Sequence, residues 1–294
     1  MKNKLTYLLA SSALVASYAS AEIVLTDDLS AYGYIDASYS SASDLGNING
    51  SVAEFELGFA FSPVDSPWSA VSEISFKDGS AGRDAEFETV TISYAYSDEL
   101  SFTVGNILSY QGFEAFDATG LYQFSYQGYG NSDVYSARYA YGVSADYATD
   151  AYGAGVWVGQ TADDLSIELF FQYTGVEGLT ATAVYADDPT YTSYNFWVSY
   201  EIDALTLAAE YVNNDFGAVE DEIYMLLAYY AMGDAGITFR YSTGEFGGFD
   251  FDRYTISPSY AFSDNVFGLL EYSFDDVDVL GEDTQLAAEL IFSF

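Results

Sequence analysis

Carboxylates are the main side chains in this chain that are suited to acid–base or metal chemistry. The 294 residues include 45 Asp and Glu but no His and no Cys. A Ser-His-Asp or Cys-His catalytic unit is therefore excluded, and so is a zinc site built on imidazole or thiolate. Oxygen ligands alone can hold Ca²⁺, so sites made only of carboxylates stay open.

Two acidic stretches resemble catalytic or metal-binding motifs without completing them. Asp187 and Asp188 are adjacent, but neighbours on a strand point to opposite faces and cannot form a carboxylate pair. Asp276 and Asp278 begin like a Ca²⁺ loop, yet Ala287 stands where the closing Glu is needed. We therefore predict no enzyme activity and no resident cofactor. The acidic outer loops are nevertheless suited to divalent cations that bridge them to lipopolysaccharide.

The net charge of the chain excludes several classes of partner. Only seven Lys and Arg oppose the acidic residues, for a formal net charge of −38. Nucleic-acid binding is not expected, because it needs a basic patch. Half of the residues are hydrophobic and 18% are aromatic. This composition argues for a folded acidic protein and against a disordered one.

Residues 1–21 have the layout of a signal peptide. Two lysines precede a short apolar run at 5–16, and small residues at 19–21 form a cleavage site. The run is shorter than the ~20 apolar residues of a membrane-spanning helix. We predict a signal peptide at 1–21 and one exported domain at 22–294.

Apolar and polar residues alternate along most of the exported domain, which predicts sixteen antiparallel strands. The expected strands are 30–40, 51–62, 68–77, 85–97, 100–109, 133–148, 151–161, 165–174, 179–186, 193–202, 205–213, 222–232, 237–243, 251–262, 266–274 and 285–294. This number of strands is typical of a porin-sized β-barrel.

The connections between these strands alternate in length. Every second one is mostly a tight turn, such as 203–204 and 263–265, whereas the others, such as 41–50 and 275–284, are mostly longer and polar. Short periplasmic turns and longer outer loops are typical of outer-membrane barrels. We therefore predict an all-β transmembrane barrel in the bacterial outer membrane. A soluble β-sandwich gives the same side-chain alternation but has no reason to alternate its loop lengths.

The final strand, 285–294, carries Leu286, Leu290 and Phe294 on one side. A free apolar edge is an aggregation hazard in water. We expect this strand to face lipid and to close the barrel by pairing with residues 32–39. A C-terminal strand that ends in Phe also resembles the assembly signal of bacterial outer-membrane proteins, which implies the barrel-assembly machinery as a partner.

The longest connection, 110–132, overlaps a recognisable motif. The segment GNILSYQGFEAFD, residues 105–117, resembles the internal motif of the OmpL-like β-barrel porins. Asn106 departs from that motif, because the family often has Lys there. The resemblance implies a diffusion channel of the outer membrane. Trimers are common among porins, although no residue here marks an interface.

General porins fold the loop between their fifth and sixth strands into the lumen as a constriction. By this similarity Glu114 and Asp117 would lie at the narrowest point. Arg138, Arg240 and Arg253 share the less apolar phase of their strands, so we expect all three to point inward. We hypothesise that the loop carboxylates face these arginines. The alternative is that each arginine pairs with a nearby Asp or Glu.

Eight glutamates outside that loop occupy the inward phase of their strands: Glu54, Glu56, Glu73, Glu168, Glu201, Glu210, Glu271 and Glu289. Carboxylates that line a narrow water path concentrate cations. We therefore predict a water-filled, cation-preferring ion channel for passive transport of small hydrophilic solutes. The alternative is a non-conducting structural or adhesive barrel. In such a barrel the glutamates would have to be paired with basic residues. Without the two lysines of residues 1–21, five basic residues remain, which are too few for that.

Overall fold

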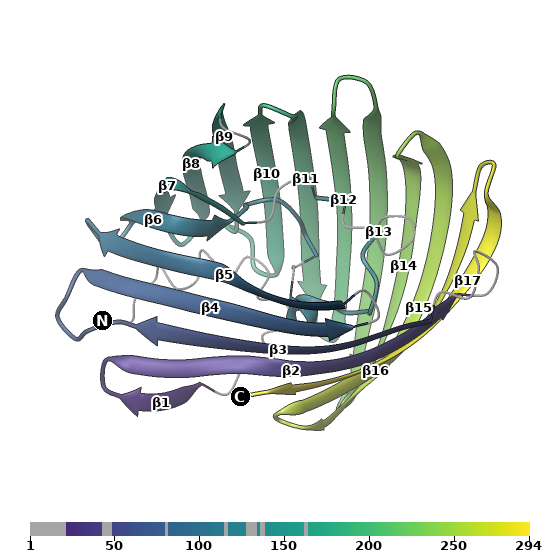
Figure 1. Cartoon of the computed structure of the whole chain (residues 1–294), viewed down its shortest axis with the longest axis horizontal. Coiled ribbons are helices and arrows are strands. Elements are labelled where there is room, and N and C mark those ends of the chain that lie inside the picture. Colours follow the sequence, from purple (N-terminus) through teal and green to yellow (C-terminus); the bar gives the residue numbers. More distant parts are fainter. Residues whose placement is uncertain are drawn as a thin grey trace.

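The chain forms a closed antiparallel β-barrel. The computed structural model describes residues 22–42, 49–79, 82–114, 117–127, 134–135, 139–161 and 164–294, so the predicted signal peptide lies outside them. Strands β2 to β17 are successive neighbours, and β17 pairs with β2 to complete the ring (Figure 1). Within these described ranges, no helix is long and apolar enough to cross a membrane.

The strands have the following bounds: β1 Ile23–Thr26, β2 Leu29–Ala42, β3 Asn49–Phe61, β4 Trp68–Gly79, β5 Gly82–Ala95, β6 Leu100–Leu108, β7 Tyr139–Ala148, β8 Tyr152–Thr161, β9 Asp164–Tyr173, β10 Leu179–Asp188, β11 Tyr191–Ile202, β12 Leu205–Asp215, β13 Glu220–Met232, β14 Ala235–Phe246, β15 Phe249–Ser263, β16 Val266–Val277 and β17 Gly281–Ser293. One 3₁₀ turn, η3, covers Ala118–Gly120.

All sixteen barrel strands correspond to predicted ones, but many continue further into the polar connections. Residues 189–190 alone join β10 to β11, and residues 247–248 join β14 to β15. Side-chain alternation does not mark these ends, because backbone hydrogen bonds between hairpin strands also hold polar stretches together. The connection after β6 is, by contrast, longer than predicted. Because β7 begins only at Tyr139, this connection is residues 109–138, called the inner loop below.

The outer face of the barrel is apolar and the inner face is polar. On β3, Phe55 and Phe59 are exposed, whereas Glu54 and Glu56 are buried. The same alternation runs along β9, β11 and β17, which confirms the faces predicted for these strands. Such an apolar exterior suits lipid, as in other membrane-spanning barrels.

The last strand closes the barrel against the first one of the ring. β17 pairs with β2 from Gln285 to Ser293, as predicted. Beyond that point Gly33 and Phe294 exchange two backbone hydrogen bonds of 2.8 and 2.9 Å. The short strand β1, which the sequence pattern does not predict, pairs with the beginning of β2.

A β-bulge on β5 turns Glu88 into the barrel. Ser72 and Ile74 of β4 pair with Val90 and Phe87, so β5 contains one residue more than β4 between these pairs. Phe87 and Val90 can both point outward as a result, and they are 61% and 40% exposed. Glu88 lies between them and is only 5% exposed. The extra residue therefore reverses the alternation on this strand.

Two residues of β6 accommodate this bulge. Gly105 has a φ of 143°, and a Cβ at this position would lie 1.9 Å from the Val90 carbonyl oxygen. The Asn106 side chain donates to the carbonyls of Glu88 and Phe87 at 2.5 and 3.3 Å. The Gly-Asn pair at the start of the motif in 105–117 thus shapes the barrel wall.

Candidate constriction inside the barrel

The inner loop turns into the lumen directly after β6 (Figure 1). Its first residues bind the wall on β9 and β11. The Ser109 hydroxyl and the Tyr110 N–H donate to the Glu168 carboxylate at 2.9 and 3.0 Å. The Gly112 N–H donates to Asn195 Oδ1 at 3.1 Å. These bonds hold the beginning of the inner loop against the wall.

Glu210 on β12 is the most heavily bonded carboxylate at the inner loop. Its Oε1 accepts from the Phe113 N–H at 2.9 Å and from Asn195 Nδ2 at 2.6 Å. Its Oε2 accepts from Gln127 Nε2 and the Tyr135 hydroxyl, both at 2.8 Å. Four neutral donors therefore satisfy this buried carboxylate without a cation.

Glu271 on β16 binds the returning half of the inner loop. Its carboxylate accepts from the Ser125 N–H at 2.9 Å, from the Ser125 hydroxyl at 2.5 Å and from the Ser273 hydroxyl at 2.7 Å. Arg253 of β15 lies 3.7 Å from Glu271 and 3.4 Å from Asp275. Arg253 therefore pairs with carboxylates of the adjacent strand, which is the local alternative to the eyelet hypothesis.

Glu114 and Arg240 form a buried ion pair between the inner loop and β14. Arg240 Nη1 lies 2.5 Å from Glu114 Oε1, and neither side chain is appreciably exposed. Gln123 Nε2 and the Gln127 N–H donate to the two Glu114 oxygens, each at 2.8 Å. Arg240 also donates to the Ser125 hydroxyl at 2.8 Å. One loop carboxylate thus faces an arginine of the wall.

Apolar packing reinforces these bonds at two places. Phe113 and Tyr122 pack with Trp197, Ala208, Met225 and Leu227, while Val134 and Tyr135 pack with Val212, Ile223, Phe251 and Val277. The sequence analysis missed this cover, although β13 signals it. Both faces of β13 are apolar, and an apolar inner face has to be covered inside the barrel.

The inner surface of β2 to β5 and of residues 285–293 of β17, called the acidic wall below, has a different character. Its acidic residues are Asp36, Glu54, Glu56, Glu73, Glu88 and Glu289. Lys77 Nζ lies among them, 3.1 Å from Glu54 and 3.8 Å from Glu88. Tyr32 donates to Glu73 at 2.6 Å. In the described part of this wall, carboxylates clearly exceed cations.

Asp117, just before η3, lies near the acidic wall. Burial raises the pKa of its carboxyl to about 7, and the negative charges of Glu88, Glu73 and Glu54 act in the same direction. Lys77 opposes the rise. The inner loop therefore extends from β14, where Glu114 is bound, towards the opposite side of the lumen.

This placement corrects part of the eyelet hypothesis. The structure brings Glu114 to Arg240, but it places Asp117 among carboxylates and not beside Arg240 or Arg253. Glu114 lies at β14, whereas Asp117 already belongs to the part of the inner loop that lies near the acidic wall. Arg138 lies outside the described residues.

The eight predicted lumen glutamates have three different environments. Glu168, Glu210 and Glu271 are buried and hold the inner loop. Glu54, Glu56 and Glu289 are buried on the acidic wall, and Glu73 is half-buried there. Glu201 is exposed near the turn from β11 to β12.

The sequence analysis missed two members of the acidic wall. Glu88 was hidden, because the bulge reverses the alternation that assigns each side chain to a face. Asp36 could have been found, since it alternates with Ile35 and Ala37.

Comparison with known proteins identifies the fold. No family model matches the chain, and no curated protein matches it. Among solved structures, a loop-deletion mutant of OmpT, an outer membrane protein of Vibrio cholerae, matches with a TM-score of 0.71 and 14% identity over 90% of this chain and 99% of that one. The anion-selective porin from Comamonas acidovorans gives the same TM-score, identity and coverage.

A third similar structure is a mutant of the Rh. blastica porin. It matches with a TM-score of 0.65 and 17% identity over 90% of this chain and 100% of that one. The matched proteins are outer-membrane proteins, among them two porins. This agrees with the successive order of β2 to β17 and with the pairing of β17 with β2, which make a closed barrel. This chain has the sixteen-strand barrel fold of outer-membrane porins.

Proposed function

We propose that this chain is a porin of the bacterial outer membrane through which small hydrophilic solutes and cations diffuse passively. One observation carries the proposal: a long loop lies inside a closed barrel and is bonded to one side of the lumen. Glu168, Glu210 and Glu271 supply three of its anchors on that side. A loop fixed in this way narrows a passage while the barrel keeps its shape. The proposal includes no chemical reaction.

The charges of the acidic wall support a preference for cations. Six carboxyl residues line this wall, and Asp117 approaches it. Among the described side chains, Lys77 is the cation that lies between these carboxylates. A narrow path beside such a wall attracts cations and repels anions. An anion-selective porin has the same fold, so selectivity is a property of the charges and not of the barrel.

Two finer features belong to the same proposal. The segment 105–117 supports a relationship to the OmpL-like porins. A trimer form is described for OmpT of Vibrio cholerae, and this supports a homotrimer here as well. Lipopolysaccharide around the barrel and the barrel-assembly machinery are the other proposed partners.

The test is single-channel recording in a planar bilayer. The chain without residues 1–21 is refolded and inserted, and a KCl gradient is applied. We expect discrete conductance steps and a reversal potential that favours K⁺. Steps that favour Cl⁻ would refute the cation preference but leave a porin. A folded, inserted barrel without conductance would favour the structural or adhesive alternative.

A further inference from the structure

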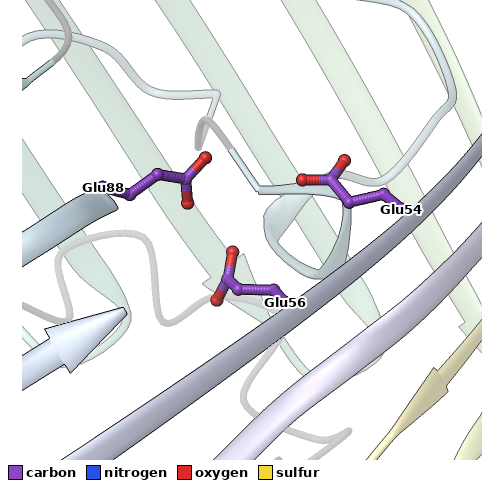
Figure 2. A group of neighbouring side chains, drawn as sticks. All are labelled: Glu54, Glu56 and Glu88. Carbon is purple, nitrogen blue, oxygen red and sulfur yellow. The ribbon is translucent and has the colours of Figure 1, made fainter. Parts of the chain in front are cut away.

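Three carboxylates of the acidic wall converge on one point. Glu54 and Glu56 come from β3, and Glu88 comes from the bulge of β5 (Figure 2). One carboxylate oxygen of each residue lies within 4.8 Å of the other two, and all three residues are buried. Three like charges so close together in a buried site require a compensating positive charge or protons.

The partners present do not satisfy this cluster. Oε2 of Glu56 and Oε2 of Glu88 are fully buried without a hydrogen-bond partner, and the two residues are only 4% and 5% exposed. The Glu56 carboxylate points into the space between the other two (Figure 2). Lys77 contacts Glu54 and Glu88 but adds only one positive charge.

A comparison inside the same barrel shows how unusual this is. Glu210 is equally buried, at 4% exposed, and accepts four hydrogen bonds from neutral donors. No such donor reaches Glu56 Oε2 or Glu88 Oε2, and the two carboxyl groups lie within hydrogen-bond reach of each other, where a shared proton or a cation can hold them together. A buried acceptor without a donor is costly, so the cluster has two oxygens available for a cation.

We propose that Glu54, Glu56 and Glu88 bind one Ca²⁺ ion. Carboxylate oxygens alone are the ligands that hard cations prefer. The three ligand atoms all lie within 4.8 Å of one another, close enough for their carboxylates to share one ion. Mg²⁺ dehydrates reluctantly and is seldom held by protein carboxylates alone, which favours Ca²⁺ at a buried site.

The bound ion would link β3 to β5 across β4, at the level where η3 approaches the wall. It would also remove two negative charges from the acidic wall. The binding itself does not depend on the proposed channel activity. It can therefore be measured on the folded barrel in detergent.

The experiment is equilibrium dialysis of the chelator-treated, refolded barrel against ⁴⁵Ca²⁺ in physiological salt. We expect the wild type to bind one equivalent of Ca²⁺ at this cluster. E56Q/E88Q should bind that equivalent about tenfold more weakly or not at all. Glutamine removes repulsion from the cluster, so this variant should fold, and its shift in electrophoretic mobility on heating verifies that. The single variant E88Q provides the same comparison with a smaller change.

The matched control is E220Q/E282Q, which removes the same charge from two exposed glutamates. It should keep the equivalent that E56Q/E88Q loses. Equal binding by all the variants would overturn the proposal. So would Mg²⁺ displacing the bound ⁴⁵Ca²⁺ as effectively as unlabelled Ca²⁺ does.

Discussion

Buried carboxylates in this barrel are stabilised by different kinds of partner. Glu114 has the guanidinium of Arg240, whereas Glu210 has only neutral donors. Breaking a buried ion pair by removing one partner typically costs about 3–5 kcal/mol, because the other charge stays buried. Removing an acceptor from a set of neutral donors costs about 1–3 kcal/mol. The two sites should therefore respond differently to substitution.

Arg240→Met should release the inner loop from β14, because Glu114 is left buried without its cation. We expect the variant to lose about 3–5 kcal/mol of unfolding free energy, measured by urea titration of the barrel in lipid vesicles. Adding Glu114→Gln to Arg240→Met should restore a large part of this loss. A single variant as stable as the wild type would show that the ion pair does not hold the loop.

Glu210→Gln should loosen the inner loop to a smaller extent. The amide nitrogen that replaces one oxygen faces donors, so bonds to Gln127 and Tyr135 or to Phe113 and Asn195 are lost. A cost of about 1–3 kcal/mol corresponds to roughly fivefold to 150-fold faster proteolytic cleavage within the loop. The exposed Glu201→Gln is the control and should leave the cleavage rate unchanged. Equal rates in both variants would contradict the assignment.

Side-chain alternation predicts on which face a residue lies, but not which partner it meets there. It placed Glu210 and Glu271 inside the barrel correctly. It could not show that a loop without periodicity brings Ser125 and Tyr135 to them. The sequence analysis compared the number of glutamates with the number of basic residues. That comparison understated how many buried carboxylates can be stabilised, because it left out hydrogen bonds from neutral donors.

At the scale of the element, the bulge on β5 determines what one wall of the lumen contains. Sequence alternation predicted all sixteen barrel strands, because each strand repeats the pattern many times. A bulge is a single event, and its only trace in the sequence is the spacing of three between Phe87 and Val90. The strands were therefore predictable, whereas the inward position of Glu88 was not.

Gly105→Ala should disrupt this bulge. The added Cβ would lie 1.9 Å from the backbone oxygen of Val90, and a φ of 143° is unfavourable for alanine. We expect a strong loss of refolding yield, measured by the heat-modifiable band on a gel. Gly217→Ala is the control, because Gly217 also has a positive φ, of 78°, but no atom within 4 Å of the added Cβ. It should cost only about 1 kcal/mol. A normal yield for Gly105→Ala would mean that β6 does not constrain the bulge.

At the scale of the whole molecule, the seam between β17 and β2 joins the last strand of the ring to the first and so closes the barrel. Phe294 bonds to Gly33, and its ring lies 6.2 Å from that of Phe55. The seam thus combines a structural contact with the position that resembles an assembly signal. These two roles can be separated, because only one of them needs cellular machinery.

Phe294→Ala should have a small effect on refolding in detergent and a large effect in cells. Loss of one partly exposed ring contact costs about 1 kcal/mol, whereas loss of the proposed assembly signal should strongly reduce the amount of barrel in the outer membrane. Phe292→Ala, which removes an exposed ring two residues earlier, is the control. Equal amounts of both variants in the outer membrane would argue against an assembly role for the last residue.

The short strand β1 has a consequence for association between copies of the chain. β17 leaves the first residues of β2 uncovered, and β1 pairs there with Ser30 and Ala31. β1 in turn presents an open edge that is only four residues long. So short an edge is a poor template for adding a foreign strand. Copies of the chain should therefore not extend one another's sheets through the β1 edge.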